Sequence, residues 1–149
     1  MRKCIEFLES KGYNIIYGDT DSIFYTILER YFEPIDKKYN FFEHRISDLL
    51  KINNKKEYWK EMVEETIKYS RIIEKDINEY LIKITGHPYM RMEYEKTLMP
   101  SLFIQKKQYC GIKHSYKASF DDLELFMKGV RIVKRNVSKF YKIVAEDML

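Results

Sequence analysis

The hydrophobic pattern of the first 28 residues predicts a helix followed by a β-hairpin. Residues 1–11 place apolar and polar side chains as an amphipathic helix does, and Gly12 is a typical residue to end it. Residues 13–17 and 22–28 are rich in apolar, β-branched and aromatic side chains, which is typical of strands. Only Gly-Asp-Thr-Asp separates them, so we expect a tight hairpin that carries two carboxylates at its tip, those of Asp19 and Asp21.

The middle of the chain is irregular until a long helical repeat begins. Residues 28–58 have mixed polarity, so we expect loops with short helical turns there. From Tyr58 to about Thr85, apolar residues recur every three or four positions, which predicts one long helix or two shorter ones. The Gly-His-Pro at residues 86–88 should end it. We interpret residues 28–89 together as a helical spacer.

The last 60 residues alternate between strand and helix patterns. Residues 89–97 alternate apolar and polar side chains, which predicts a strand. After a turn at Pro100, residues 99–112 predict a second strand that continues into a hairpin. A helix is expected from about Asp121, interrupted at Gly129, and a last amphipathic helix over residues 137–149. The expected fold class is α+β, with an antiparallel sheet and flanking helices.

Composition and charge narrow the class of protein. A chain of 149 residues with 45% hydrophobic and 34% charged residues predicts a soluble globular protein with one core. No apolar run approaches about 20 residues, so no transmembrane helix is expected. Cys4 and Cys110 form no metal-binding pattern, which favours a reduced, intracellular protein. Residues 96–149 carry 11 Lys and Arg against 5 Asp and Glu, so this third is the candidate surface for a polyanion.

The two hairpin carboxylates are the first candidate site. Strand side chains two residues apart point the same way, so Asp19 and Asp21 should repel each other unless a cation offsets their charge. Mg²⁺ is suited to this, because it takes carboxylate oxygens together with substrate phosphates. Two alternatives remain open on these residues alone. The aspartates can cap their own backbone at the turn, and sugar-nucleotide transferases use the same Asp-x-Asp pattern.

Two groups of basic residues are candidates for binding DNA. Lys106, Lys107 and Tyr109 lie in Lys-Lys-Gln-Tyr, where strand alternation predicts that Lys107 and Tyr109 share a face. A cation beside an aromatic hydroxyl suits the sugar-phosphate and the minor-groove edge of a duplex. The second group would lie along one helix face: Lys128, Arg131, Arg135 and Lys139, with Lys134 nearby. Ordinary solvated surfaces are the alternative for both groups.

Three motifs in order along the chain resemble those of family B DNA polymerases. YGDTDS at residues 17–22 is similar to the most diagnostic motif of that family. MEYEKTLMPSLFIQKKQYCG at 92–111 resembles the acidic strand and the Lys-Lys-x-Tyr hairpin that follow it. KGVRIVKRNVSKFYK at 128–142 resembles the segment that opens the thumb. Within it, VSKFYK is similar to polymerases of large double-stranded DNA viruses. The likeness covers residues 1–27 and 90–142, whereas Gln108 and Asn136 depart from the family pattern.

The resemblance implies a fold, an activity and roles for residues. Residues 1–112 would form part of a palm and residues 113–149 the start of a helical thumb. The activity would be template-directed nucleotidyl transfer in DNA replication, with two Mg²⁺ ions, a primer–template and deoxynucleoside triphosphates. Asp21 would be the direct metal ligand, Asp19 would support it, and Glu95 would lie nearby. DNA would be held by Lys106, Lys107, Tyr109, Lys128, Arg131, Lys134, Arg135 and Lys139.

Some motifs of that family are not found in these residues. Nothing resembles D-x-x-S-L-Y-P, which supplies another metal-binding Asp, or K-x-x-x-N-S-x-Y-G, which holds the incoming nucleotide. We therefore expect that residues outside this chain complete the metal site and that residues 1–149 alone do not extend a primer. The alternative is a non-catalytic remnant that at most binds duplex DNA through residues 96–149. A sugar-nucleotide transferase would leave both basic groups without a purpose.

Overall fold

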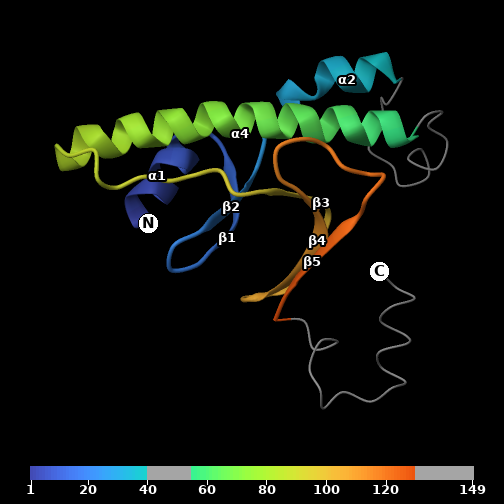
Figure 1. Ribbon diagram of the computed structural model, residues 1–149. Helices are drawn as coiled ribbons and strands as arrows, with labels where there is room; N and C mark the ends of the chain where they lie inside the picture. The colour runs from blue at the N-terminus through green and yellow to red at the C-terminus, as the bar shows by residue number, and fades with distance from the viewer. Residues whose placement is uncertain (40–54, 130–149) are drawn as a thin grey trace, which may run out of the picture.

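The structure is a computed structural model and describes residues 1–39 and 55–129. These residues form the expected α+β fold (Figure 1). The predicted helix over 137–149 lies outside the described residues, as do Arg131, Lys134, Arg135 and Lys139. The elements, in chain order, are α1 (Arg2–Ser10), β1 (Asn14–Gly18), β2 (Ile23–Thr26), the 3₁₀ turn η1 (Glu29–Tyr31), α2 (Glu33–Lys38), α4 (Lys55–Thr85), β3 (Thr97–Gln105), β4 (Gln108–His114) and β5 (Glu124–Lys128).

The predicted helix and hairpin at the N-terminal end are confirmed. Gly12 takes a φ of +88° just after α1, and the Tyr13 N–H donates to the Leu8 carbonyl at 3.1 Å, which closes the helix end. Strands β1 and β2 pair antiparallel, from Asn14 opposite Thr26 to Gly18 opposite Ile23. The two predicted aspartates therefore lie in the tip that joins these strands.

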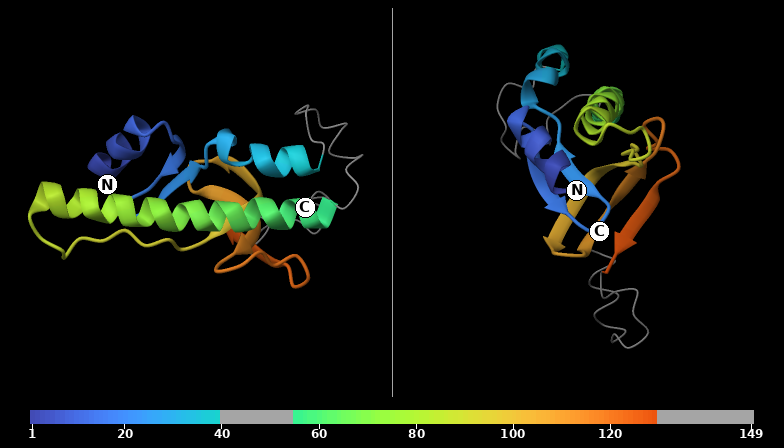
Figure 2. Two further views of the ribbon diagram at one scale, coloured as in Figure 1. Left: turned by 90° about the horizontal axis from the view of Figure 1, so that it is seen from above. Right: turned by 90° about the vertical axis from the view of Figure 1, so that its left-hand side faces the viewer.

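Residues Lys55–Thr85 form one continuous helix of 31 residues, about 46 Å long. It lies across one side of the molecule, with α1 and α2 beside opposite ends of it (Figures 1 and 2). The Phe7 ring of α1 stacks on Tyr80 with a centroid distance of 4.5 Å. One cluster of buried side chains joins α1, α4 and the residue after β2: Cys4, Leu8, Ile27, Ile73, Ile77 and Leu81.

The prediction of a strand over residues 89–97 is wrong. Residues 90–96 join no sheet, and a side chain of α4 takes the backbone hydrogen bonds of Met92 in the middle of this segment. The Asn78 amide donates to the Met92 carbonyl at 2.9 Å and accepts from the Met92 N–H at 2.8 Å. Strand β3 begins only at Thr97 and runs through Pro100, where we expected a turn, with a register shift between Leu98 and Ser101.

The prediction of a helix from about Asp121 is also wrong for the described residues. Glu124–Lys128 form strand β5, which pairs antiparallel with β4 along its whole length. A pattern of five residues is too short to distinguish a helix from a strand. Residues 124–128 therefore form a strand because β4 offers a free edge for hydrogen bonding. An ion pair between Lys113 and Glu124 at 2.7 Å adds a cross-strand contact.

In residues 1–39 and 55–129, the strands form two sheets, β1–β2 and β3–β4–β5, rather than one. The boundary between palm and thumb after residue 112 stays a prediction. Within the described ranges, no helix combines the length and apolar character needed to span a membrane.

Candidate functional site

Asp19 is held by backbone and side-chain donors at the tip of the β1–β2 hairpin. Its N–H donates to the Ser22 carbonyl at 2.9 Å, which closes the tip. Its carboxylate Oδ1 accepts from the Thr20 N–H at 2.9 Å. This hydrogen bond, followed by the nearby Lys107 ammonium, lowers the pKa of the Asp19 carboxyl, although partial desolvation opposes both. The Asp19 side chain is 16% exposed and ionised at neutral pH.

Lys107 contacts this carboxylate from the other hairpin. Its Nζ lies 3.6 Å from Asp19 Oδ1. Strand β3 ends at Gln105 and β4 begins at Gln108, so Lys107 belongs to the two-residue turn between them and has a φ of +63°. The prediction that Lys107 shares a strand face with Tyr109 is therefore wrong. The turn instead points the Lys107 side chain at Asp19, a contact that sequence alone did not suggest.

Tyr109 lies inside an aromatic cluster that joins the two sheets. The residue is 3% exposed, and its ring stacks on Phe103 at 5.2 Å and on Phe126 at 6.0 Å. Phe24 of β2 meets the same ring edge-on at 5.0 Å, and Tyr17 of β1 lies 6.1 Å away. Burial raises the pKa of the Tyr109 hydroxyl. The cluster fixes one hairpin against the other.

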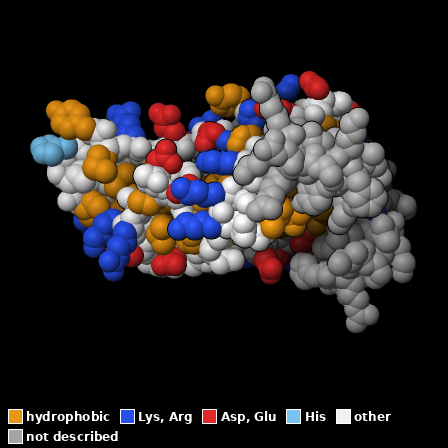
Figure 3. All heavy atoms as spheres, turned by 90° about the horizontal axis from the view of Figure 1, so that it is seen from below, with side chains coloured by type: hydrophobic (Ala, Val, Ile, Leu, Met, Phe, Trp, Pro, Cys, Tyr) orange, Lys and Arg blue, Asp and Glu red, His pale blue; other side chains and the backbone are white. Residues whose placement is uncertain are grey.

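Three lysines lie at the end of the three-stranded sheet that faces the Asp19 tip. Lys106 and Lys107 are exposed on the β3–β4 turn. Lys128 stands opposite Tyr109 at the end of β5, and its ammonium partly opposes the rise in the pKa of the Tyr109 hydroxyl. Figure 3 views the side of the molecule on which both hairpin tips lie, where several Lys and Arg side chains lie close together with some Asp and Glu side chains among them. Such a surface favours a polyanion.

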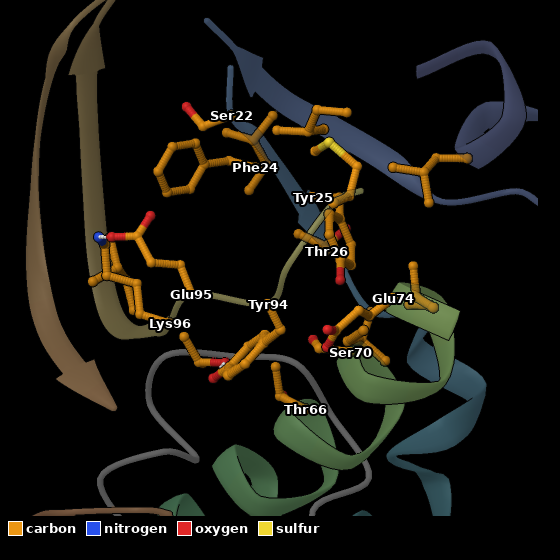
Figure 4. Close-up of a pocket in the computed structure, with 18 of the residues that line it drawn as sticks. Ser22, Phe24, Tyr25, Thr26, Thr66, Ser70, Glu74, Tyr94, Glu95 and Lys96 are labelled. Carbon is orange, nitrogen blue, oxygen red and sulfur yellow. Dashed lines mark hydrogen bonds and ion pairs between the residues drawn. The ribbon is translucent and has the colours of Figure 1, made fainter. Parts of the chain in front are cut away.

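Asp21 lies on the wall of a cavity of about 660 Å³. The cavity lies between the β1–β2 hairpin, α4 and the extended segment before β3 (Figure 4). Glu93 and Glu95 line the same cavity. Asp21 therefore lines the same cavity as the predicted Glu95, whereas Asp19 contacts Lys107. Both aspartates lie in the predicted tip, outside the residues of β1 and β2, so strand alternation does not set the directions of their side chains.

Glu95 pairs with Lys96, a residue that the sequence analysis missed. The Lys96 side chain is only 8% exposed, and its ammonium lies 4.2 Å from the centre of the Phe126 ring. The Glu95 side chain is exposed, so this ion pair places a mostly buried ammonium beside an exposed carboxylate at the cavity wall. Nothing in the local sequence marks Lys96, since its burial arises from β5, which was expected to be a helix.

The residues around the tip have the chemistry that a hard divalent cation needs. Carboxylate oxygens suit Mg²⁺, and Asp21 is exposed, so its oxygens are open to a ligand. One oxygen of Asp19 is already engaged by Thr20 and Lys107. Among the residues that the structure describes, no group of three or more His, Cys, Asp or Glu side chains converges as a ready metal site.

Comparisons with known proteins agree with the motifs. A model of DNA polymerase family B matches residues 57–149. DNA polymerase beta of African swine fever virus is 33% identical over 143 residues, which cover 96% of this chain and 11% of the viral protein. The DNA polymerase catalytic subunit of human herpesvirus 7 is 28% identical over 144 residues, which cover 97% of this chain and 10% of that protein. This chain therefore spans about a tenth of the length of these relatives. No solved structure matches it significantly.

Proposed function

Because this chain belongs to DNA polymerase family B, we propose that its residues form part of a site for template-directed nucleotidyl transfer in DNA replication. The substrates would be a primer–template and deoxynucleoside triphosphates. The observation that carries the proposal is the placement of Asp19 and Asp21 on a hairpin tip that packs beside a lysine-bearing turn. Residues 1–112 would belong to the palm, and residues 113–149 would begin the thumb.

In this proposal the two aspartates have different roles. Asp21 is exposed at the tip and would hold the metal directly. Asp19 is tied to Thr20 and Lys107, so it would fix the shape and charge of the tip. Glu95 would face the same space from the cavity wall. Bound Mg²⁺ would lower the pKa of a primer hydroxyl and neutralise triphosphate charge. Further ligands would come from substrate and from residues outside this chain.

The basic residues would hold DNA through its backbone. Lys106, Lys107 and Lys128 carry exposed side chains at one end of the sheet and would contact phosphates without reading sequence. Tyr109 would contribute through its hydroxyl beside Lys128, since its ring is covered. The proposal extends this surface to Arg131, Lys134, Arg135 and Lys139, which lie outside the described residues.

The metal role predicts a local response to Mn²⁺, a paramagnetic substitute for Mg²⁺. In NMR spectra of the labelled chain, Mn²⁺ should broaden the amide signals of residues 19–22 first, and Asp21→Asn should abolish this. The control Glu79→Gln changes an exposed carboxylate on α4 and should leave the broadening in place. Broadening that is centred elsewhere, or that persists in Asp21→Asn, would contradict the metal role of Asp21.

The DNA role predicts binding of a primer–template that weakens with salt. Removing one phosphate contact should lower the slope of log affinity against log salt by about 0.9. We expect this change for Lys106→Met and Lys128→Met, and no change for the exposed Lys75→Met on α4, as measured by fluorescence anisotropy. Metal-dependent incorporation of nucleotides by residues 1–149 alone would refute the expectation that the site is completed from outside.

A further inference from the structure

The end of strand β5 makes an unusually close backbone contact with the turn that carries Lys107. Gly129 follows β5 with a φ of +67°. A Cβ atom placed on Gly129 would lie 2.0 Å from the Lys107 carbonyl oxygen and 3.1 Å from the carbonyl carbon. The obstacle is backbone, which has no rotamer to relieve the clash. Any side chain at residue 129 must therefore displace either the turn or the end of β5, and both changes disturb the contact between them.

The same turn determines where the Lys107 ammonium lies. Lys107 has a left-handed φ of +63°, which few residues other than Gly and Asn adopt readily, so the turn conformation needs support from its surroundings. Tyr109 anchors one side of it through the aromatic cluster, and Gly129 packs on its carbonyl from β5. On the opposite side, the ammonium lies 3.6 Å from Asp19 Oδ1. Gly129, Lys107 and Asp19 thus form a chain of contacts from β5 to the hairpin tip.

We propose that Gly129 is a positioning residue that sets the β3–β4 turn so that the Lys107 ammonium lies against the Asp19 carboxylate. Its lack of a side chain allows β5 to dock, and docking joins the lysine-bearing turn to the carboxylate tip as one unit. The inference deepens the proposed function, on which it rests for its purpose, because it names a residue that has no side chain with which to bind metal or phosphate. The contact itself does not depend on that function.

The test compares two glycines that share a backbone conformation but differ in surroundings. Gly86 has a φ of +74°, and a Cβ there would meet nothing within 4 Å. Gly86→Ala therefore carries the cost of the positive φ alone, whereas Gly129→Ala adds the clash with Lys107. Lys107→Met removes the ammonium but keeps the length and backbone preference of the side chain. The readout is the ¹³C chemical shift of the Asp19 carboxyl at neutral pH, which senses the neighbouring ammonium.

We expect Gly129→Ala and Lys107→Met to displace the Asp19 signal in the same direction. The double variant should show no further displacement, since both changes act through one contact. Gly86→Ala should leave the signal in place. Gly129→Ala should also lower the salt slope of duplex binding by about 0.9, as Lys107→Met does. An Asp19 signal that stays unchanged in Gly129→Ala while the free energy of unfolding falls would overturn the proposal, because the glycine would then be merely structural.

A measurement on the unchanged protein keeps the proposal testable if Gly129→Ala fails to fold. The α protons of Gly129 should show nuclear Overhauser contacts to Lys107 and Gln108, and their absence would overturn the close approach. Failure of the proposed function has a different signature. If no variant or parent binds duplex DNA while the Asp19 shifts follow the expected pattern, the positioning role stands and the DNA role is refuted.

Discussion

Tyr109 illustrates how one side chain can serve the candidate site without facing solvent. Its ring fills the junction between the two sheets, where it touches Phe24 from one and Phe103 and Phe126 from the other. Lys107, two residues earlier, is exposed and reaches Asp19. The aromatic ring therefore supports the turn from which the lysine extends. The buried Tyr109 ring thus stabilises the turn, and the exposed Lys107 ammonium provides the charge.

This division predicts separate effects for two changes at Tyr109. Tyr109→Ala should lower the free energy of unfolding by about 3–5 kcal/mol, because a buried aromatic ring leaves a cavity. Tyr109→Phe keeps the ring and should stay within about 1.5 kcal/mol of the parent. Urea unfolding measures both. A loss of equal size in the two variants would show that the hydroxyl, rather than the ring, holds the junction.

At the scale of elements, a single side chain of α4 replaces a strand neighbour. Asn78 satisfies both backbone groups of Met92, and the Arg71 guanidinium lies 4.7 Å from the centre of the Tyr94 ring. These contacts hold the segment before β3 against the helix, where Glu93, Glu95 and Lys96 line the cavity. The cavity wall is thus set by contacts between a helix and an extended chain rather than by a sheet.

We predict that Asn78→Ala loosens this segment. The change leaves the N–H and the carbonyl of Met92 without these partners, which should cost about 1–3 kcal/mol. Hydrogen exchange at the Met92 amide should become faster. Glu79→Ala, at a neighbouring exposed position, should change stability by less than about 0.5 kcal/mol. Unchanged exchange at Met92 in Asn78→Ala would contradict the tethering role.

The contact between α2 and α4 predicts a dependence of stability on pH. Lys38 donates a hydrogen bond to Glu61, and Tyr39 donates another at 2.9 Å. The Lys38 hydrogen bond, with help from Tyr39, lowers the pKa of the Glu61 carboxyl in the folded state. Its stabilisation is therefore fully present above the unfolded pKa of about 4.3, and it is lost as pH falls through the lower folded value.

The measurement is the free energy of unfolding between about pH 6 and pH 3. Glu61→Gln should flatten the decline on the acid side, because the titrating group is gone. The exposed Glu64→Gln on the same helix should retain the parent profile. Identical acid profiles for the parent and Glu61→Gln would show that the carboxylate adds nothing to the contact between the helices.

At the scale of the whole molecule, stability and site depend on different contacts. The buried cluster between α1 and α4 provides an apolar core, whereas the candidate site lies at the far ends of the two hairpins (Figure 1). Leu8 is 0% exposed in that cluster. The aromatic cluster around Tyr109 connects the hairpin with the three-stranded sheet. A core defect should therefore weaken the fold while leaving the local contacts of the tip intact in the molecules that remain folded.

We predict that Leu8→Ala lowers the free energy of unfolding by about 2–5 kcal/mol, a large part of the stability of a small domain. Leu125→Ala, on a residue that is 43% exposed, should cost much less. Thermal unfolding followed by circular dichroism measures both. The Mn²⁺ response of residues 19–22 should survive in folded Leu8→Ala. Equal losses for the two leucines would contradict the assignment of the core.

The sequence by itself determined the local elements and the family. Side-chain periodicity predicted α1, the β1–β2 hairpin and a helical region that the structure shows to be the single helix α4, because each is stabilised by contacts between near neighbours or by one continuous apolar face. Three motifs in order along the chain indicated the family, and the match of residues 57–149 to the model of DNA polymerase family B confirms it. These features needed no knowledge of distant contacts.

Only the tertiary structure decided the elements whose hydrogen-bond partners lie far away in the chain. Residues 124–128 become a strand because β4 offers an edge, and residues 90–96 stay outside a sheet because Asn78 takes the hydrogen bonds of Met92. The pair of Lys107 with Asp19, the burial of Tyr109 and the close approach of Gly129 likewise join segments about 20 to 90 residues apart. Local pattern carries no information on such contacts, because their free energy arises only when the chain has folded.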